Sequence, residues 1–526
     1  MSPPTSWLFP RPHALPGEDA AYFPDTGFTV VPEARWSEQD FANLGEGSQP
    51  FSADFLEYAA LVGHEQTHWI QANAFAYGRF LARIDQARSE IAESFIGLFT
   101  SEQVELLTSR RLQGQVVLKL APSHRILKRR EFGPIGALLQ RHWWSLGLLR
   151  HELEESDRLL GGLEPSAFRF GLAVLYAEAG PYVSRVAMLP PPALKALARE
   201  RAPTGSYGRA LAQCDYPELS SVAIAECCAV LDQHWAYAHA AESFRRRGDA
   251  ASADRLHRTH VASWESKEPT QYGDAFRAFA HFCPHLDLNA PRPLLTLGIA
   301  GCLAMDGNFP PEAKGGRPTW LDISPPLRFL RLIRAVRRVG VVPVDVLCDL
   351  TPAKTRAYCE DLLDAAGLPQ STHHRLPRMP AHAQDLSPMG SLRRLFHDAH
   401  VASTHLRRLM PAALLAPSET AIHRADELVY GTLKASSLAR LPPLMSVGGR
   451  SVPIGLDPTR FAECAVAGAY QRLLWQLIGD TGPLRFAGLP TDGAGLAAAR
   501  RALTVLRERT ERPVAMQLGD DAVPSL

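Results

Sequence analysis

The chain has 526 residues, of which 46% are hydrophobic and 21% are charged. This composition is typical of globular proteins and excludes a wholly disordered chain, while the length exceeds that of one ordinary hydrophobic core. The 56 Lys+Arg residues against 55 Asp+Glu leave a net charge of +1. The attraction that draws strongly basic proteins to nucleic acids or anionic membranes is therefore missing, and we expect neither as a partner.

The eight cysteines form no Cys-x-x-Cys pair, so they indicate reduced thiols in a cytosolic protein rather than a disulfide framework. The first ten residues lack the basic segment and apolar stretch of a secretory signal. The most apolar run, residues 294–305, is too short to span a bilayer. We therefore expect a cytoplasmic protein.

Taken in chain order, residues 1–50 are rich in Pro, Gly and acidic residues and predict an extended wrap with one strand at 28–31. From Asp54 the apolar residues recur at helical spacing. Asp54 followed by Glu57 has the form of a capping box, so we expect a helix that begins there, passes Phe75 and continues toward Phe80.

Beyond this helix, Val-, Phe- and Tyr-rich segments at 115–120 and 168–189 predict extended structure. Helical periodicity predicts further helices at 85–107, 135–149, 218–244, 327–339, 352–366, 389–410, 418–436, 458–479 and 495–509.

A Pro- and Gly-rich stretch at 306–326 breaks the pattern. The chain thus predicts five parts, namely the wrap at 1–50, a core at 51–305, this connection, a helical C-terminal region at 327–480 and a tail at 481–526 with one short helix. The expected fold class is mainly α, or α+β with a small sheet.

One motif in the sequence indicates a metal-binding site. His64-Glu65-Gln-Thr-His68 lies in the first long predicted helix. Two histidines four residues apart stand on one face of a helix, so both imidazoles can reach one tetrahedral cation. Glu65 points partly sideways, toward the remaining coordination positions, where it can take a proton from water. The pattern predicts a zinc site with His64 and His68 as ligands and Glu65 as the catalytic base.

A catalytic zinc needs a third protein ligand and an open fourth position. The continuation to a third histidine is absent, because position 71 is Gln and position 74 is Ala. Glu226 is the best candidate, since it is a lone acid in an otherwise apolar helix of small residues, where an unpaired carboxylate is costly. Glu178, near a segment predicted to be extended, is the second candidate.

The His-Glu-x-x-His helix with a glutamate on a downstream helix resembles the gluzincin branch of the zincin metallopeptidases. The resemblance covers the two motif helices, about 60 residues. It implies a zincin-like core, His64, His68 and Glu226 as zinc ligands, and Glu65 as general base and acid. It also implies a peptide or protein as the substrate.

Two features depart from that family. Many gluzincins have an acid four residues after the ligand glutamate that orients a histidine, whereas position 230 is Val; Asp232 or another acid would supply this hydrogen bond. The residue that would steady the oxyanion has several candidates, which are Tyr207, His234, Tyr237 and His239.

The expected function is that of a zinc-dependent hydrolase that cleaves peptide bonds. Two other functions stay open. Two histidines and one carboxylate also suit ferrous iron in an oxygenase. Alternatively, the protein is a helical scaffold without enzymatic activity, in which the metal, or the motif without a metal, only holds two helices together. The oligomeric state does not follow from the sequence.

Overall fold

The computed structural model describes the chain mainly as helices with a small sheet, which is the predicted fold class. The described residues are 13–14, 20–24, 27–31, 52–108, 117–118, single positions between 136 and 154, 219–265, 273–288, 290–306, 324–349, 352–369, 390, 394, 444–447, 450–452, 458–479, 484–485, 489–490 and 492–511. The predicted strand at 168–189 and, apart from residues 390 and 394, the predicted helices at 389–410 and 418–436 lie outside them.

Helix α2, Ala53–Ala74, carries the His-Glu-x-x-His motif. Its N-cap is Ser52, whose hydroxyl oxygen accepts a hydrogen bond from the backbone N–H of Phe55 at 3.1 Å. Asp54 lies in the first turn, so the predicted capping box at Asp54 is wrong. Serine satisfies an orphan N–H group at the helix start as well as aspartate does, and it stands two residues earlier.

The helix does not continue to Phe80 as predicted. Phe75 adopts an extended conformation, and α3, Ala76–Ile96, begins directly after it. Gly78 lies at this kink, where a Cβ atom would stand 2.2 Å from the backbone oxygen of Gln71. The chain can fold back this closely on the end of α2 only because residue 78 has no side chain.

The predicted helix at 85–107 is likewise two helices. α3 ends at Ile96, and α4, Ser101–Thr108, follows. The backbone N–H of Gly97 closes the end of α3 by donating to the carbonyl oxygen of Glu93, as helix C-caps commonly do.

Helix α9, Ser221–Arg246, is the second long helix at the centre of the molecule and corresponds to the one predicted at 218–244. Ser220 caps it by accepting from the N–H of Ala223 at 3.0 Å. All residues from Ser221 to Leu231 are buried, among them Ala223, Ala225 and Ala229. These small side chains let α2 and other helices approach α9 closely. The helices that pack on it besides α2 are α10, Ala250–Glu265, α11, Asp274–Phe282, α12, Pro291–Met305, and α14, Pro325–Val339.

The C-terminal helices agree closely with the periodicity of the sequence. α14, Pro325–Val339, α16, Pro352–Ala366, α19, Pro458–Gly479, and α20, Gly493–Glu511, match predicted helices, and the short α15, Val344–Asp349, is additional. The described positions between 136 and 147 are helical, in agreement with the helix predicted at 135–149.

The main sheet has the strand order β1-β2-β3-β5-β6. The predicted strand at 28–31 is β3, Phe28–Val31, which pairs in parallel with β5, Leu444–Val447. The antiparallel pairs are β1, His13–Ala14, with β2, Ala21–Phe23, β2 with β3, and β5 with β6, Arg450–Val452. A separate pair joins β4, Val117–Leu118, which lies in the predicted extended segment 115–120, to β7, Leu484–Arg485.

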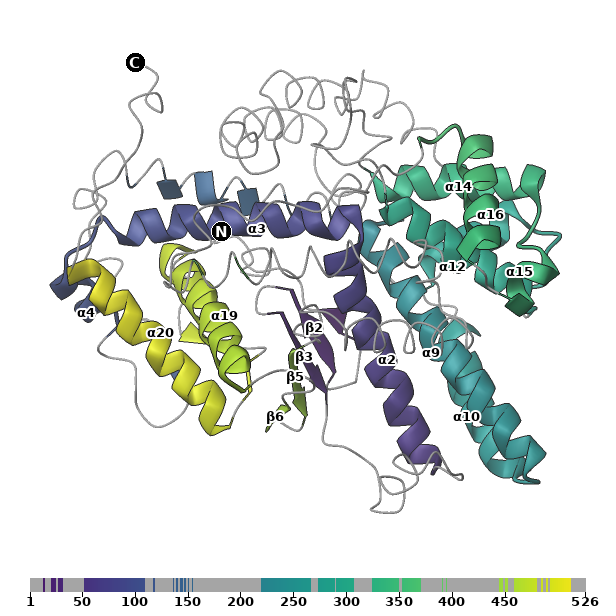
Figure 1. Cartoon of the computed structure of the whole chain (residues 1–526), viewed down its shortest axis with the longest axis horizontal. Coiled ribbons are helices and arrows are strands. Elements are labelled where there is room, and N and C mark those ends of the chain that lie inside the picture. The colour runs from purple at the N-terminus through teal and green to yellow at the C-terminus, as the bar shows by residue number, and fades with distance from the viewer. Residues whose placement is uncertain are drawn as a thin grey trace.

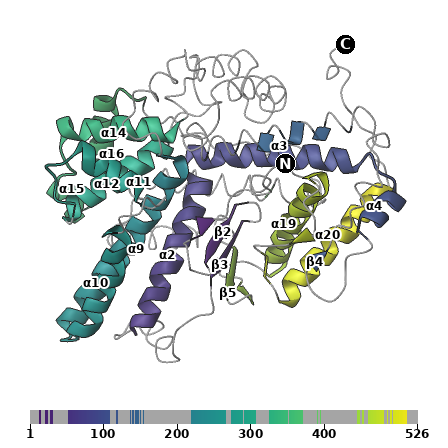
Figure 2. The same cartoon turned by 180° about the vertical axis from the view of Figure 1, so that it is seen from behind.

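Two groups of helices flank this sheet (Figure 1). α2 and α9 lie side by side on one side of it, α19 and α20 lie on the other, and α3 runs across the end of both groups, as the reverse view also shows (Figure 2). One hydrophobic core cluster includes buried residues from Phe28 to Leu506. α12 lies deep inside, since every residue from Pro293 to Met305 is buried.

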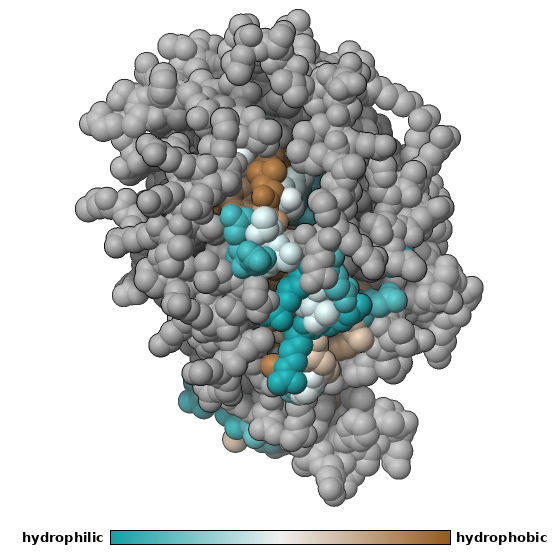
Figure 3. All heavy atoms as spheres, turned by 90° about the vertical axis from the view of Figure 1, so that its left-hand side faces the viewer, coloured by the Kyte–Doolittle hydropathy of each residue, from teal (hydrophilic) through white to brown (hydrophobic). Residues whose placement is uncertain are grey.

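On the side where α4 and α20 lie, many of the visible described residues are hydrophilic (Figure 3). The exposed residues of α20 include Arg500, Arg501 and Glu508, whereas Ala502 and Leu506 face the core. Among the described helices, none is long and apolar enough to cross a membrane.

Candidate metal centre

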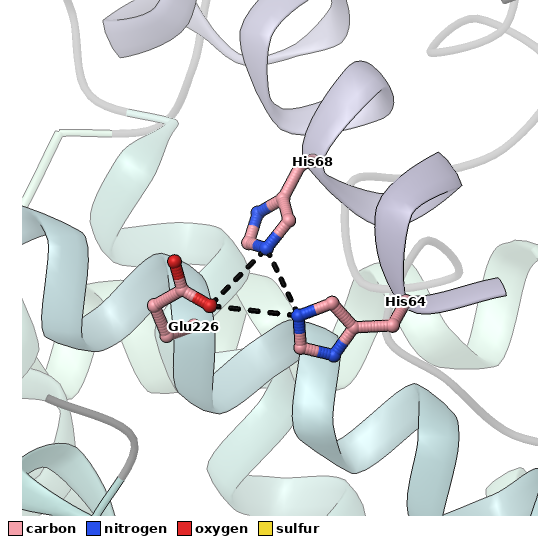
Figure 4. Close-up of side chains that lie close together, drawn as sticks. All are labelled: His64, His68 and Glu226. Carbon is pink, nitrogen blue, oxygen red and sulfur yellow. Dashed lines mark hydrogen bonds and ion pairs between the residues drawn. The ribbon is translucent and has the colours of Figure 1, made fainter. Parts of the chain in front are cut away.

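The motif helix and α9 bring three ligand-type side chains to one point. His64 and His68 lie on the face of α2 that packs against α9, and Glu226 extends from α9 toward both (Figure 4). The Nε2 atoms of the two histidines are 3.1 Å apart. Oε2 of Glu226 lies 3.2 Å from Nε2 of His68 and 3.5 Å from Nε2 of His64.

These three separations can be compared with what a metal ion requires. Zinc binds imidazole nitrogen and carboxylate oxygen at about 2.0–2.2 Å, and the edges of the corresponding tetrahedron are about 3.3–3.5 Å long. The observed triangle is close to one face of such a tetrahedron. Among the described residues, this is the one group of three or more His, Cys, Asp or Glu whose ligand atoms lie close enough to share an ion.

The site is buried, since the exposed fraction is 0% for His64 and 1% for both His68 and Glu226. Burial lowers the pKa of His64. It acts in the same direction on His68, but the charge of Glu226, its hydrogen bond and the charge of Glu65 prevail and raise the pKa of His68 to about 9. Without a metal, a proton on His68 therefore compensates the buried carboxylate of Glu226.

Glu65 is as deeply buried as the histidines, with an exposed fraction of 0%. Its charge contributes to the raised pKa of His68. The predicted base thus follows His64 directly in α2, and its buried carboxylate interacts electrostatically with His68.

Gln71 is a site residue that the sequence analysis missed. Its Oε1 accepts a hydrogen bond from Nδ1 of His68 at 2.9 Å, and its Nε2 donates to the backbone oxygen of Ala225 at 2.8 Å. The first contact keeps a proton on Nδ1 of His68, so that Nε2 is the nitrogen left to carry the second proton toward Glu226 or, once that proton is lost, to bind a metal ion. The second contact ties α2 to α9 next to Glu226. A polar residue three positions after a ligand histidine is the only signal that the sequence offers.

Asp232, the acid predicted to orient a ligand histidine, instead accepts a hydrogen bond from the hydroxyl of Thr67 at 2.7 Å. Thr67 lies beside His68 in the motif, so this contact also holds α2 against α9. The hydrogen bond to Nδ1 of His68 comes from Gln71, an amide rather than an acid.

The second candidate for the third ligand and the candidates for stabilising the oxyanion do not join the three ligand-type side chains. Glu178 and Tyr207 lie outside the described residues, as does the side chain of His239. His234 and Tyr237 follow Glu226 by two to three turns of α9, about 12 and 16 Å along the helix axis. They are therefore remote from the three ligand-type atoms, and the structure assigns neither to the oxyanion.

Comparison with protein-family models, with curated proteins and with solved structures finds no match for this chain.

Proposed function

We propose that the protein is a zinc-dependent hydrolase that cleaves peptide bonds. The observation that supports this most directly is the triangle of Nε2, Nε2 and Oε2 atoms with edges of 3.1–3.5 Å, in a site whose motif helix also carries the buried Glu65. In this proposal His64, His68 and Glu226 hold the ion, and Glu65 is the proton carrier.

The donor set fits the ion in charge as well as in distance. Two imidazoles and one carboxylate are a ligand set of catalytic zinc sites. Both imidazoles are uncharged when neutral, so the negative charge of the buried Glu226 carboxylate needs one positive charge nearby. In the metal-free protein this positive charge is a proton on His68. A divalent cation replaces this proton, so we expect zinc binding to release protons.

When bound, zinc supplies a Lewis acid that polarises a carbonyl group and lowers the pKa of a water molecule. Glu65 accepts the proton that this water loses and passes it to the leaving amine nitrogen. Gln71 keeps His68 in the tautomer that presents Nε2. The choice of a peptide as substrate rests on the resemblance to gluzincins.

The cytoplasm is the compartment that we propose. Six cysteines whose side chains the structure describes are free and buried, namely Cys227, Cys228, Cys283, Cys302, Cys359 and Cys464, as is common in proteins of reducing compartments.

The substitution Glu65→Gln tests the proposed base. It removes the proton acceptor and keeps the size of the side chain, so we expect peptide hydrolysis to fall about 100- to 10,000-fold while zinc stays near one per chain. The assay is cleavage of an internally quenched peptide library, with zinc measured in the same samples.

Retained hydrolysis in this variant would remove Glu65 from the mechanism. Iron in place of zinc in protein purified without added metal, with turnover that depends on oxygen, would favour the oxygenase instead. Glu57→Gln, on the same helix but near its start, is the matched control.

A further inference from the structure

The C-terminal half of α14 presents a row of arginines to the solvent. The residues between these arginines, at positions 332, 333, 335 and 336, are buried. The exposed side chains are those of Arg331, Arg334, Arg337 and Arg338. Spacings of three, three and one residues place them on one face of the helix, over a length of about 10 Å. We call this surface the arginine face.

The positive charge of the arginine face is not cancelled within the part of the chain that the structure describes. None of its four guanidinium groups forms an ion pair there. The acids with partners are Asp274 of α11, which pairs with Arg277, and Asp345 of α15, which pairs with Lys354 of α16. The other charged residues of α16 are Arg356, Glu360, Asp361 and Asp364. At the surface, α14 and α16 thus carry five unpaired arginines against three unpaired carboxylates.

Uncharged neighbours hold three of the four guanidinium groups in place. Arg334 lies over the ring of Phe282, 4.7 Å from its centroid. Nε of Arg337 donates to the carbonyl oxygen of Phe282, and Nη2 of Arg338 donates to that of Ala365. Each guanidinium has five N–H donors, so most of them stay available. Because the side chains are already ordered, they lose less conformational entropy when they bind an anion.

The stability of the helix does not account for this row of arginines. Like charges three or four residues apart repel each other on a helix, as Arg334 does with Arg331 and Arg338. The negative C-terminal end of the helix dipole favours cations in the last turn only. It therefore explains Arg337 and Arg338 but not the other two. An anionic partner compensates all four charges.

We propose that the arginine face binds an acidic segment of a partner protein. Guanidinium groups bind carboxylates through paired hydrogen bonds, which are stronger than hydrogen bonds between neutral groups. The length of about 10 Å corresponds to about three residues of an extended chain, so a short run of Asp or Glu covers it. This inference is independent of the candidate metal centre.

Two other kinds of anionic partner fit this surface less well. Single-stranded nucleic acids stack their bases on aromatic side chains, and helices that lie on membranes insert apolar side chains. Among the described residues, Val344 is the one large hydrophobic residue that is well exposed. The exposed Asp361 and Asp364 of α16 also repel a long polyanion more than a short acidic segment.

The binding of labelled peptides to the full chain tests the inference. We would measure fluorescence anisotropy at low ionic strength with a peptide of four consecutive Glu residues between Gly-Ser linkers, and with the same peptide carrying Gln instead. A thymidine pentanucleotide, which has the same charge as the Glu peptide, and vesicles that contain phosphatidylserine are the competing ligands. We expect the Glu peptide to bind about 10-fold tighter than the Gln peptide, and the difference to shrink as salt is added.

The double substitution Arg331→Gln/Arg334→Gln should remove most of this preference without lowering the thermal midpoint by more than a few degrees. If the double variant does not fold, Arg331→Gln alone should still reduce the preference, since this side chain holds no other described residue in place. The matched control is Arg500→Gln/Arg501→Gln, which removes two exposed arginines of α20. α20 lies at the opposite end of the molecule from α14 (Figure 1, Figure 2), so the control should bind like the wild type.

Equal affinity for the Glu and Gln peptides would overturn the inference. An equal loss of binding in the α14 and α20 variants would do the same, because it would show a general effect of net charge. Tighter binding of the pentanucleotide or of the vesicles than of the Glu peptide would replace the acidic segment by that ligand.

Discussion

At the residue scale, Gln71 shows how few contacts define the candidate site. Its amide joins the ring of His68 to the backbone of α9 through two hydrogen bonds of 2.9 and 2.8 Å. Side chains that orient a metal ligand in this way influence affinity although they do not touch the ion. The geometry of the site therefore depends on a residue outside the His-Glu-x-x-His motif.

The substitution Gln71→Ala should weaken zinc binding about 10- to 100-fold, because Nδ1 of His68 loses its acceptor and its ring orientation. Competition with a chelator measures the affinity. Gln86→Ala, which removes a partly buried glutamine of α3 that hydrogen-bonds to Glu90, is the matched control. Equal zinc affinity in the Gln71 and Gln86 variants would show that His68 is oriented without Gln71.

The sequence predicted that His64, His68 and Glu226 come together, but it did not predict the residues that hold them in place. The spacing of His64 and His68 sets their shared face in any helix, and the cost of burying Glu226 without a partner indicated a ligand role. The role of Gln71 depends on where the oxygen of Ala225 lies, and Asp232 contacts Thr67 because of how α2 is placed on α9. Such contacts between two helices have no periodicity that a single sequence could reveal.

At the element scale, the kink between α2 and α3 ends the helix that carries the candidate metal centre. The periodicity of apolar residues continues through Phe75, which explains why the predicted helix was too long. The break depends instead on the close approach of Gly78 to the end of α2. Hydrophobic periodicity detects which face of a helix is buried, but it does not detect such a backbone contact.

The substitution Gly78→Ala should lower the free energy of unfolding by about 2–4 kcal/mol, because the added Cβ would lie 2.2 Å from the oxygen of Gln71. Thermal unfolding measures the effect. Gly97→Ala is the control, since its Cβ would meet its nearest neighbours at 3.4 and 3.5 Å and its φ of −62° suits any residue. A Gly78 variant as stable as the Gly97 variant would mean that the kink tolerates a side chain.

At the scale of the whole molecule, residues from the two ends of the sequence meet in one core. β3 pairs with β5 across more than 400 residues of chain. The ring of Phe28 in β3 also packs edge-on against Phe461 in α19, with centroids 5.5 Å apart. The strand itself was predicted from its local composition, but its partner could not be, because parallel pairing leaves no local pattern in the sequence.

The substitution Phe28→Ala should lower the thermal midpoint of the protein and its stability by about 3–5 kcal/mol, since this fully buried ring joins the N-terminal strands to α19. Val30→Ala, at a partly buried position of the same strand, should lower the stability by less. Equal losses in the two variants would indicate that the contact with Phe461 contributes little.

The metal content of the purified chain tests the central claim most directly. We would measure zinc by elemental analysis in the wild type, in Glu226→Gln and in Glu242→Gln, a substitution of an exposed glutamate on the same helix. The account predicts about one zinc per chain in the wild type and in Glu242→Gln, and loss of most of it in Glu226→Gln. A wild type that binds no zinc, or a Glu226 variant that retains it in full, would contradict the account.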